Sequence, residues 1–133
     1  MSVCGGKLLI VDDEPDVTAL AQAVLADDGY TFVTAGDGEE GFRMAKTEKP
    51  DLILLEVQMP KKDGFQTFGD LRRDEATKHI PVIMLTAVTA RTGIRFDGKT
   101  MGEYFGSEPE AYLDKPIEPS RLRDTVKRLV CRK

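Results

Sequence analysis

The sequence has few of the side chains that usually mark metal sites, disulfide frameworks or histidine catalysis. It contains one histidine, His79, and two cysteines, Cys4 and Cys131, which lie near the two ends of the chain. None of the three has a companion Cys or His at the spacing of a metal site. We therefore expect free thiols and no catalytic role for the histidine.

Long apolar runs and an excess of basic residues are missing as well. The runs LLIV at residues 8–11 and IPVIML at residues 80–85 are too short to span a bilayer or to form a signal-peptide core. Lys and Arg number 19 against 23 Asp and Glu, a net charge of -4, which offers no basic surface for nucleic acid. These absences predict a cytoplasmic protein that binds neither a membrane nor, by this chain alone, nucleic acid, and they leave its oligomeric state open.

The remaining composition is typical of one globular domain. The chain has 133 residues, of which 32% are charged and 41% hydrophobic, enough to bury a core without metal or disulfide crosslinks. Five short apolar runs alternate with stretches of helical period, which predicts an α/β fold with a parallel sheet covered by helices. The runs occupy residues 7–11, 30–35, 51–55, 82–87 and 111–113. We expect a single domain over residues 1–133, with an enlarged irregular segment at 88–110.

Two glycine-rich motifs match phosphate-binding patterns by letter. GDGEEG at residues 36–41 follows a predicted strand and opens a helix, as a dinucleotide-binding loop does. Its acids, Asp37, Glu39 and Glu40, would place negative charge where a pyrophosphate must lie, whereas they suit the positive end of a helix dipole. A tight turn with acidic capping residues is the favoured interpretation.

The second motif, GIRFDGKT at residues 93–100, fits the nucleotide-binding pattern G-x-x-x-x-G-K-[ST]. It begins several residues after its strand, and few residues follow it for the rest of such a fold. A surface insertion is favoured, and a small nucleotide-binding protein that uses residues 93–100 stays as an alternative.

A third group of residues is spread along the chain at the ends of the predicted strands. Asp12 and Asp13 follow the first strand, Glu56 the third, Thr86 the fourth and Lys115 the fifth. In an open parallel sheet the carboxyl ends of the strands converge on one crevice, so we expect these side chains to meet. Three carboxylates against one ammonium group need a further positive charge, and Mg²⁺ prefers such oxygen ligands.

The segments LLIVDDEP, PDLILLEVQMPKKDG, IPVIMLTA and AYLDKPI, in this order, resemble the receiver domain of response regulators in two-component signalling. The resemblance implies a doubly wound, flavodoxin-like (βα)5 sandwich of three layers, with strand order 2-1-3-4-5 and five helices. It also implies a sensor histidine kinase or another signalling protein as partner. In that family a phosphoryl group passes from the kinase to an Asp at the end of the third strand, and Mg²⁺ is bound beside it.

The resemblance assigns roles to single residues. Asp12 and Asp13 match the acidic pair, with Asp13 as the direct metal ligand. Glu56 occupies the phosphoacceptor position, and Gln58 matches the residue whose backbone carbonyl completes the metal shell. Thr86 matches the switch hydroxyl that turns toward the phosphoryl group, and Tyr112 matches the aromatic residue that changes rotamer on activation. Lys115 matches the ammonium group that pairs with the phosphoryl group.

Glu56 departs from the family pattern because the acceptor is ordinarily Asp. Its extra methylene moves the carboxylate outward by about 1.5 Å, and phosphoryl transfer depends on positioning. We predict a poor phosphoacceptor and a protein that acts by contact, not as an enzyme. Glu56 would either hold the domain in an active-like state or disable the switch. The glutamate could also have been introduced by an engineered Asp→Glu change. A Mg²⁺-dependent phosphohydrolase is a weaker alternative, since Glu56 impairs that chemistry equally.

Only one predicted helix, residues 119–130, follows the fifth strand. This predicts a stand-alone receiver, or one domain of a longer protein.

Overall fold

The structure is a computed structural model that describes residues 6–57, 64–87, 109–115 and 117–130. Five parallel strands form one sheet in the order β2-β1-β3-β4-β5, as predicted. Their bounds are β1 (Gly6–Val11), β2 (Tyr30–Ala35), β3 (Leu52–Glu56), β4 (Val82–Ala87) and β5 (Ala111–Lys115).

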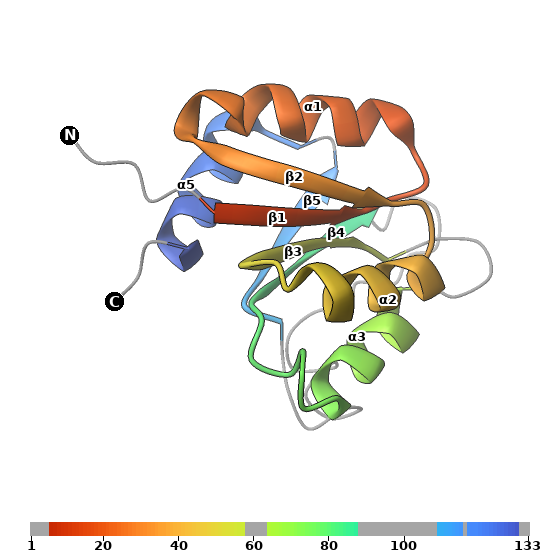
Figure 1. Cartoon of the computed structure of the whole chain (residues 1–133). Helices are drawn as coiled ribbons and strands as arrows, with labels where there is room; N and C mark the ends of the chain where they lie inside the picture. Colours follow the sequence, from red (N-terminus) through yellow and green to blue (C-terminus); the bar gives the residue numbers. More distant parts are fainter. Residues whose placement is uncertain (1–5, 58–63, 88–108, 116, 131–133) are drawn as a thin grey trace.

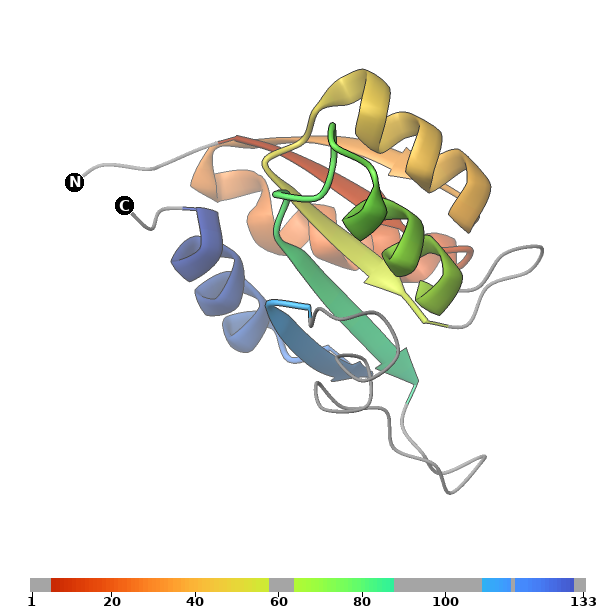
Figure 2. The same cartoon turned by 90° about the horizontal axis from the view of Figure 1, so that it is seen from below.

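Helices cover both faces of this sheet. They are α1 (Pro15–Leu25), α2 (Gly38–Glu48), α3 (Gly64–Arg73) and α5 (Pro119–Val130). Helices α1 and α5 lie on one face, and α2 and α3 lie on the other (Figures 1 and 2). The three-layer doubly wound sandwich is therefore confirmed. In the described part of the chain, no helix is both long and apolar enough to cross a bilayer.

Each face of the sheet has its own hydrophobic core, because successive side chains of a strand point to opposite faces. Leu54 of β3 and Leu85 of β4 belong to the core under α1 and α5, which we call the α1/α5 face. Leu55 and Met84 belong to the core under α2 and α3, the α2/α3 face. The central strands are buried on both faces, which explains why they appear in the sequence as continuous apolar runs.

The GDGEEG motif forms a helix start, as predicted. The Asp37 carboxylate accepts the Glu40 N–H at 2.9 Å, and the Glu40 carboxylate accepts the Gly36 N–H at 2.8 Å, an arrangement close to a capping box. At Gly41, an added Cβ would lie 2.8 Å from two side-chain carbons of Val11. The acids therefore cap α2, and this glycine lets the helix pack closely on β1.

Some predicted features fall elsewhere or outside the described residues. Glu56 and Lys115 were expected just past their strands, but β3 and β5 include them, whereas the fourth run at 82–87, which contains Thr86, coincides with β4. The pairing extends this far because the Val57 N–H still donates to the Leu85 carbonyl at 3.0 Å. The nucleotide-loop motif at 93–100, and all but the last two residues of the enlarged segment 88–110, lie outside the described residues.

An ion pair joins the end of α3 to the start of β5. Arg72 Nη2 donates to both carboxylate oxygens of Glu110, at 2.8 and 3.0 Å, and Arg72 Nη1 donates to the Ile80 carbonyl at 3.0 Å. The Glu110 carboxylate also accepts the Val82 N–H at 2.8 Å. These bonds fix the entry of β5 into the sheet at the edge opposite the predicted site.

Candidate functional site at the carboxyl edge of the sheet

Two buried carboxylates lie at the carboxyl ends of neighbouring strands. Asp12 follows β1 directly and is 5% exposed, and Glu56 is the last residue of β3 and is 1% exposed. β1 and β3 pair in parallel, and strand alternation places Asp12 and Glu56 on the same side of the sheet as Ile10 and Leu54. The fold therefore brings both acids to one point, as the sequence predicts.

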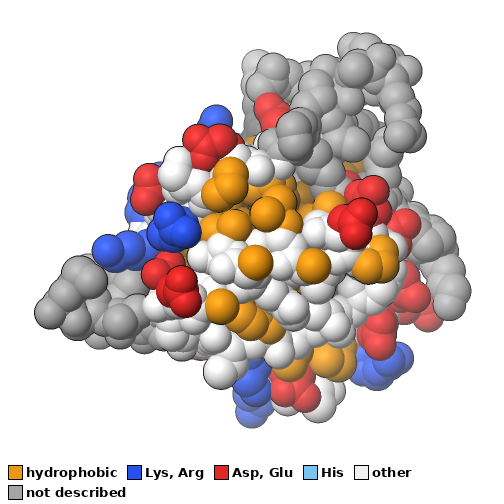
Figure 3. Space-filling view, turned by 90° about the horizontal axis from the view of Figure 1, so that it is seen from above, with side chains coloured by type: hydrophobic (Ala, Val, Ile, Leu, Met, Phe, Trp, Pro, Cys, Tyr) orange, Lys and Arg blue, Asp and Glu red, His pale blue; other side chains and the backbone are white. Residues whose placement is uncertain are grey.

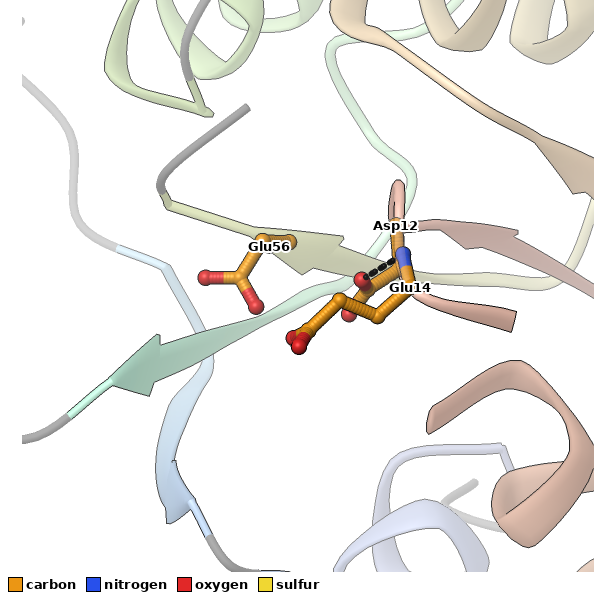
Figure 4. A group of neighbouring side chains, drawn as sticks. All are labelled: Asp12, Glu14 and Glu56. Carbon is orange, nitrogen blue, oxygen red and sulfur yellow. Dashed lines mark hydrogen bonds between the residues drawn. The ribbon is translucent and has the colours of Figure 1, made fainter. Parts of the chain in front are cut away.

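Glu14 joins them. One carboxylate oxygen from each of Asp12, Glu14 and Glu56 lies within 4.8 Å of the other two, and Figure 4 shows the three side chains converging. We call these three residues the acid cluster. The Asp12 Oδ1 accepts the Glu14 N–H at 2.8 Å, as an Asp side chain does when it bonds the backbone two residues on in a turn.

Asp13 does not belong to the acid cluster. It is exposed and, together with Asp12, lines a groove with residues of α1 and the end of β2, including Thr18 and Thr34. The sequence prediction named Asp13 as the direct ligand, whereas the structure brings Glu14 to the buried acids. A hydrogen bond from the Glu14 N–H to the Asp12 carboxylate closes the turn that spans Asp13.

The surface beside the acid cluster carries little positive charge. Helix α1 begins at Pro15 directly after Glu14, and its sequence PDVTALAQAVL contains no Lys or Arg. Hydrophobic side chains occupy the middle of this face, and acidic side chains gather toward the end at which α1 begins (Figure 3). No side chain of the helix next to the site therefore compensates the charge of the acid cluster.

The donor set of the acid cluster suits a hard divalent cation. Three carboxylates this close cannot all stay ionised without a compensating charge, and Mg²⁺ binds one or two carboxylates while it keeps several waters. Two of the three carboxylates are buried, so solvent screens their charges poorly. The residues present thus fit a Mg²⁺ site.

The predicted switch residues lie on the two strands beyond Glu56. Thr86 of β4 is 9% exposed, and its hydroxyl donates to the Asp114 carboxylate of β5 at 2.7 Å. Tyr112 is half-buried against the core of the α2/α3 face. Lys115 ends β5 in register with Ala87, but its side chain, like the whole of Gln58, lies outside the described residues.

Sequence reasoning missed Glu14, Asp114 and Gly64 as parts of this site. Glu14 had a signal, an acid two residues after Asp12 and directly before a helix-starting proline. Asp114 had a weaker one, its position next to Lys115. Gly64 begins α3, and its N–H donates to the Val57 carbonyl at 2.7 Å, which ties the helix to the end of β3.

Comparisons with known proteins agree with this geometry. The family model of the response regulator receiver domain matches residues 8–127. The chain is 40% identical over 126 residues to the alkaline phosphatase synthesis transcriptional regulatory protein PhoP of Bacillus subtilis, covering 95% of this chain and 49% of that protein. It thus spans about half the length of that relative. Protein PilH of Pseudomonas aeruginosa is 34% identical over 120 residues, with 90% of this chain and 93% of that protein covered.

Solved structures give the same result. The chemotaxis protein CheY4 of Vibrio cholerae superposes with a TM-score of 0.76 at 32% identity, covering 92% of this chain and 97% of that one. The receiver domain of sensor histidine kinase PA1611 of Pseudomonas aeruginosa has a TM-score of 0.79 at 25% identity, with coverages of 96% and 99%, and holds a magnesium ion in its active-site cleft. The nucleotide-binding and phosphohydrolase alternatives are not favoured. The chain belongs to the response regulator receiver domain family of two-component signalling.

Proposed function

We propose that this chain is a receiver module whose acceptor position, Glu56, takes up phosphoryl groups poorly. The observation that carries this proposal is that the backbone at Glu56, the last residue of β3, is held by hydrogen bonds of the residue that follows it. The side chain is buried, and the residue that follows, Val57, donates its N–H to Leu85 and accepts the N–H of Gly64. The backbone is held from two sides, so it does not retract to offset the extra methylene.

Misplacement of a reacting atom by about 1 Å costs on the order of a hundredfold in rate. Phosphoryl transfer is especially sensitive because the protein contributes mainly position and charge stabilisation. The lengthened carboxylate of Glu56 therefore disfavours attack on a phosphoryl donor, although its charge and burial resemble those of an ordinary acceptor. The chain then acts through protein contacts and not as an enzyme.

We also propose that Mg²⁺ binds at the two buried carboxylates of the acid cluster. Asp12 and Glu56 are the buried ligands, and either Asp13 or Glu14 supplies the third carboxylate. The Gln58 backbone carbonyl is assigned to the shell by resemblance to the family. When bound, the ion would neutralise these carboxylates and stabilise charge on a phosphoryl oxygen.

The partner proposed for this module is a sensor histidine kinase or another signalling protein, and the interaction is proposed to take place in the cytoplasm. Of the two outputs expected for Glu56, the structure supports the disabled switch. A carboxylate carries one negative charge against about -1.5 to -2 for a phosphoryl group, so mimicry is partial. The hydroxyl of Thr86 is bonded to Asp114, which does not support a state in which that hydroxyl is turned toward Glu56.

The test of poor acceptance is incubation with a small phosphodonor and Mg²⁺, followed by intact mass spectrometry. We expect no substantial gain of one phosphoryl mass, because Glu56 is misplaced for in-line attack. A large gain that disappears in Glu56→Ala would refute the proposal. A gain that persists in Glu56→Ala would show modification elsewhere.

The metal proposal predicts a distinct result in a Mg²⁺ or Mn²⁺ titration. Asp12→Asn is expected to weaken binding at least about tenfold, because a buried ligand is lost. Parallel titrations of Asp13→Asn and Glu14→Gln identify which of these two acids binds the ion. Asp16→Asn removes an equal charge from the exposed first turn of α1 and should leave the affinity nearly unchanged. Equal affinities in Asp12→Asn and the unaltered chain would contradict the metal site.

A further inference from the structure

The hydroxyl of Thr86 forms a hydrogen bond to a side chain of the neighbouring strand. Thr86 of β4 and Asp114 of β5 are cross-strand partners, and the Thr86 Oγ1 donates to the Asp114 Oδ1 at 2.7 Å. Thr86 is buried while Asp114 is exposed. The acceptor is a carboxylate, which makes a stronger hydrogen bond than a neutral acceptor does.

Strand alternation shows which way this bond directs the hydroxyl. Thr86 follows Met84 at a spacing of two residues and therefore belongs to the α2/α3 face. Glu56 follows Leu54 at the same spacing and belongs to the α1/α5 face. The bond to Asp114 thus keeps the hydroxyl on the side of the sheet away from the acid cluster.

We propose that Asp114 is a positioning residue that holds Thr86 in the resting rotamer. This inference rests on the proposed role of Thr86 as the switch hydroxyl. To turn toward a group at Glu56, the hydroxyl must first leave the Asp114 carboxylate. A hydrogen bond to a charged acceptor biases such an equilibrium by about tenfold or more. Asp114 therefore sets how readily the switch moves.

Three variants separate this role from a general effect on the fold. Asp114→Val keeps a β-branched, strand-compatible side chain but removes the acceptor. Asp114→Asn keeps an oxygen acceptor but removes the charge. Asp124→Asn is the matched control, since Asp124 is an exposed residue of α5 and loses the same charge. Asp114 is itself exposed, so all three chains are expected to fold.

The primary measurement is the χ1 rotamer distribution of Thr86, obtained by NMR from scalar couplings to its Cγ2 methyl carbon. We expect one dominant rotamer in the unaltered chain and in Asp124→Asn. In Asp114→Val the ratio of the second rotamer to the first should rise by about tenfold, with Asp114→Asn in between. This readout requires neither metal nor phosphoryl transfer, so it is independent of whether Glu56 accepts a phosphoryl group.

The second measurement places Asp114→Val in a chain that also carries Glu56→Asp. Its rate of phosphorylation by a small phosphodonor should exceed that of Glu56→Asp alone, by up to about tenfold. An unchanged Thr86 rotamer distribution in Asp114→Val would overturn the inference. So would a changed distribution accompanied by an unchanged rate. If Glu56→Asp accepts no phosphoryl group, the acceptor assignment fails, and the rotamer measurement still decides whether Asp114 holds Thr86.

Discussion

Glu56→Asp is expected to raise the rate of phosphorylation by a small phosphodonor at least about a hundredfold over the unaltered chain. The shorter side chain withdraws the carboxylate by about 1.5 Å. The backbone around residue 56 stays in place because Val57 is hydrogen-bonded to β4 and to the start of α3. The substitution therefore corrects the position of the acceptor without disturbing the strand.

Intact mass spectrometry at several times after addition of the phosphodonor and Mg²⁺ measures this rate. Two controls accompany it. Glu56→Gln keeps the length of the side chain and loses the nucleophilic charge, so it should stay unmodified. Glu56→Asp combined with Asp12→Asn should lose most of the gain, since the proposed ion then lacks a buried ligand. Equal rates for Glu56→Asp and the unaltered chain would show that side-chain length does not limit acceptance.

Gly64→Ala is expected to lower the free energy of unfolding by about 3 kcal/mol, because overpacking against a fixed backbone costs about this much. An added Cβ would collide with the Glu56 carbonyl oxygen and lie 2.8 Å from the Val57 Cα. Both contacts are with backbone atoms, of the last residue of β3 and of Val57 directly after it, and the Val57 backbone is hydrogen-bonded to Leu85 and to Gly64. Helix α3 or the end of β3 must shift, and Glu56 shifts with it.

Urea denaturation followed by circular dichroism measures this change. Gly36→Ala is the matched control, because an added Cβ there would meet only the Glu40 carboxylate, at 3.8 Å. Its effect should stay within about 0.5 kcal/mol, as at most surface sites. If the two substitutions change stability equally, the close approach of Gly64 to β3 is not a packing constraint.

The sheet could be predicted from sequence because its central strands are buried on both faces. Such strands are continuous apolar runs, and a parallel order with helical connections follows from their alternation with helical stretches. The positions of Asp12, Glu56 and Thr86 could be predicted for the same reason, since each lies at the carboxyl end of such a run. The last helix was predicted from about Pro119 to Val130, and α5 occupies these residues.

The finer contacts of the site could not be predicted, because they depend on local turns and on register. Whether Asp13 or Glu14 faces Glu56 depends on the hydrogen bond that closes the turn after β1. The pairing of Thr86 with Asp114 joins residues that are 28 positions apart and depends on how β4 and β5 align. The approach of Gly64 to β3 likewise depends on the packing distance of a helix, which hydrophobic periodicity does not specify.

In the proposed function, the alternation of side chains across the sheet separates the residues that bind the ion and the phosphoryl group from the residues that respond to them. The acid cluster draws its two buried members from the α1/α5 face, whereas Thr86 and Tyr112 belong to the α2/α3 face. Rotation of the Thr86 hydroxyl at the sheet edge would therefore convert a change of charge on one face of the sheet into a change of side-chain conformation on the other. A partner bound over α1 would act on the α1/α5 face, while a partner that senses Tyr112 would detect the outcome on the opposite layer.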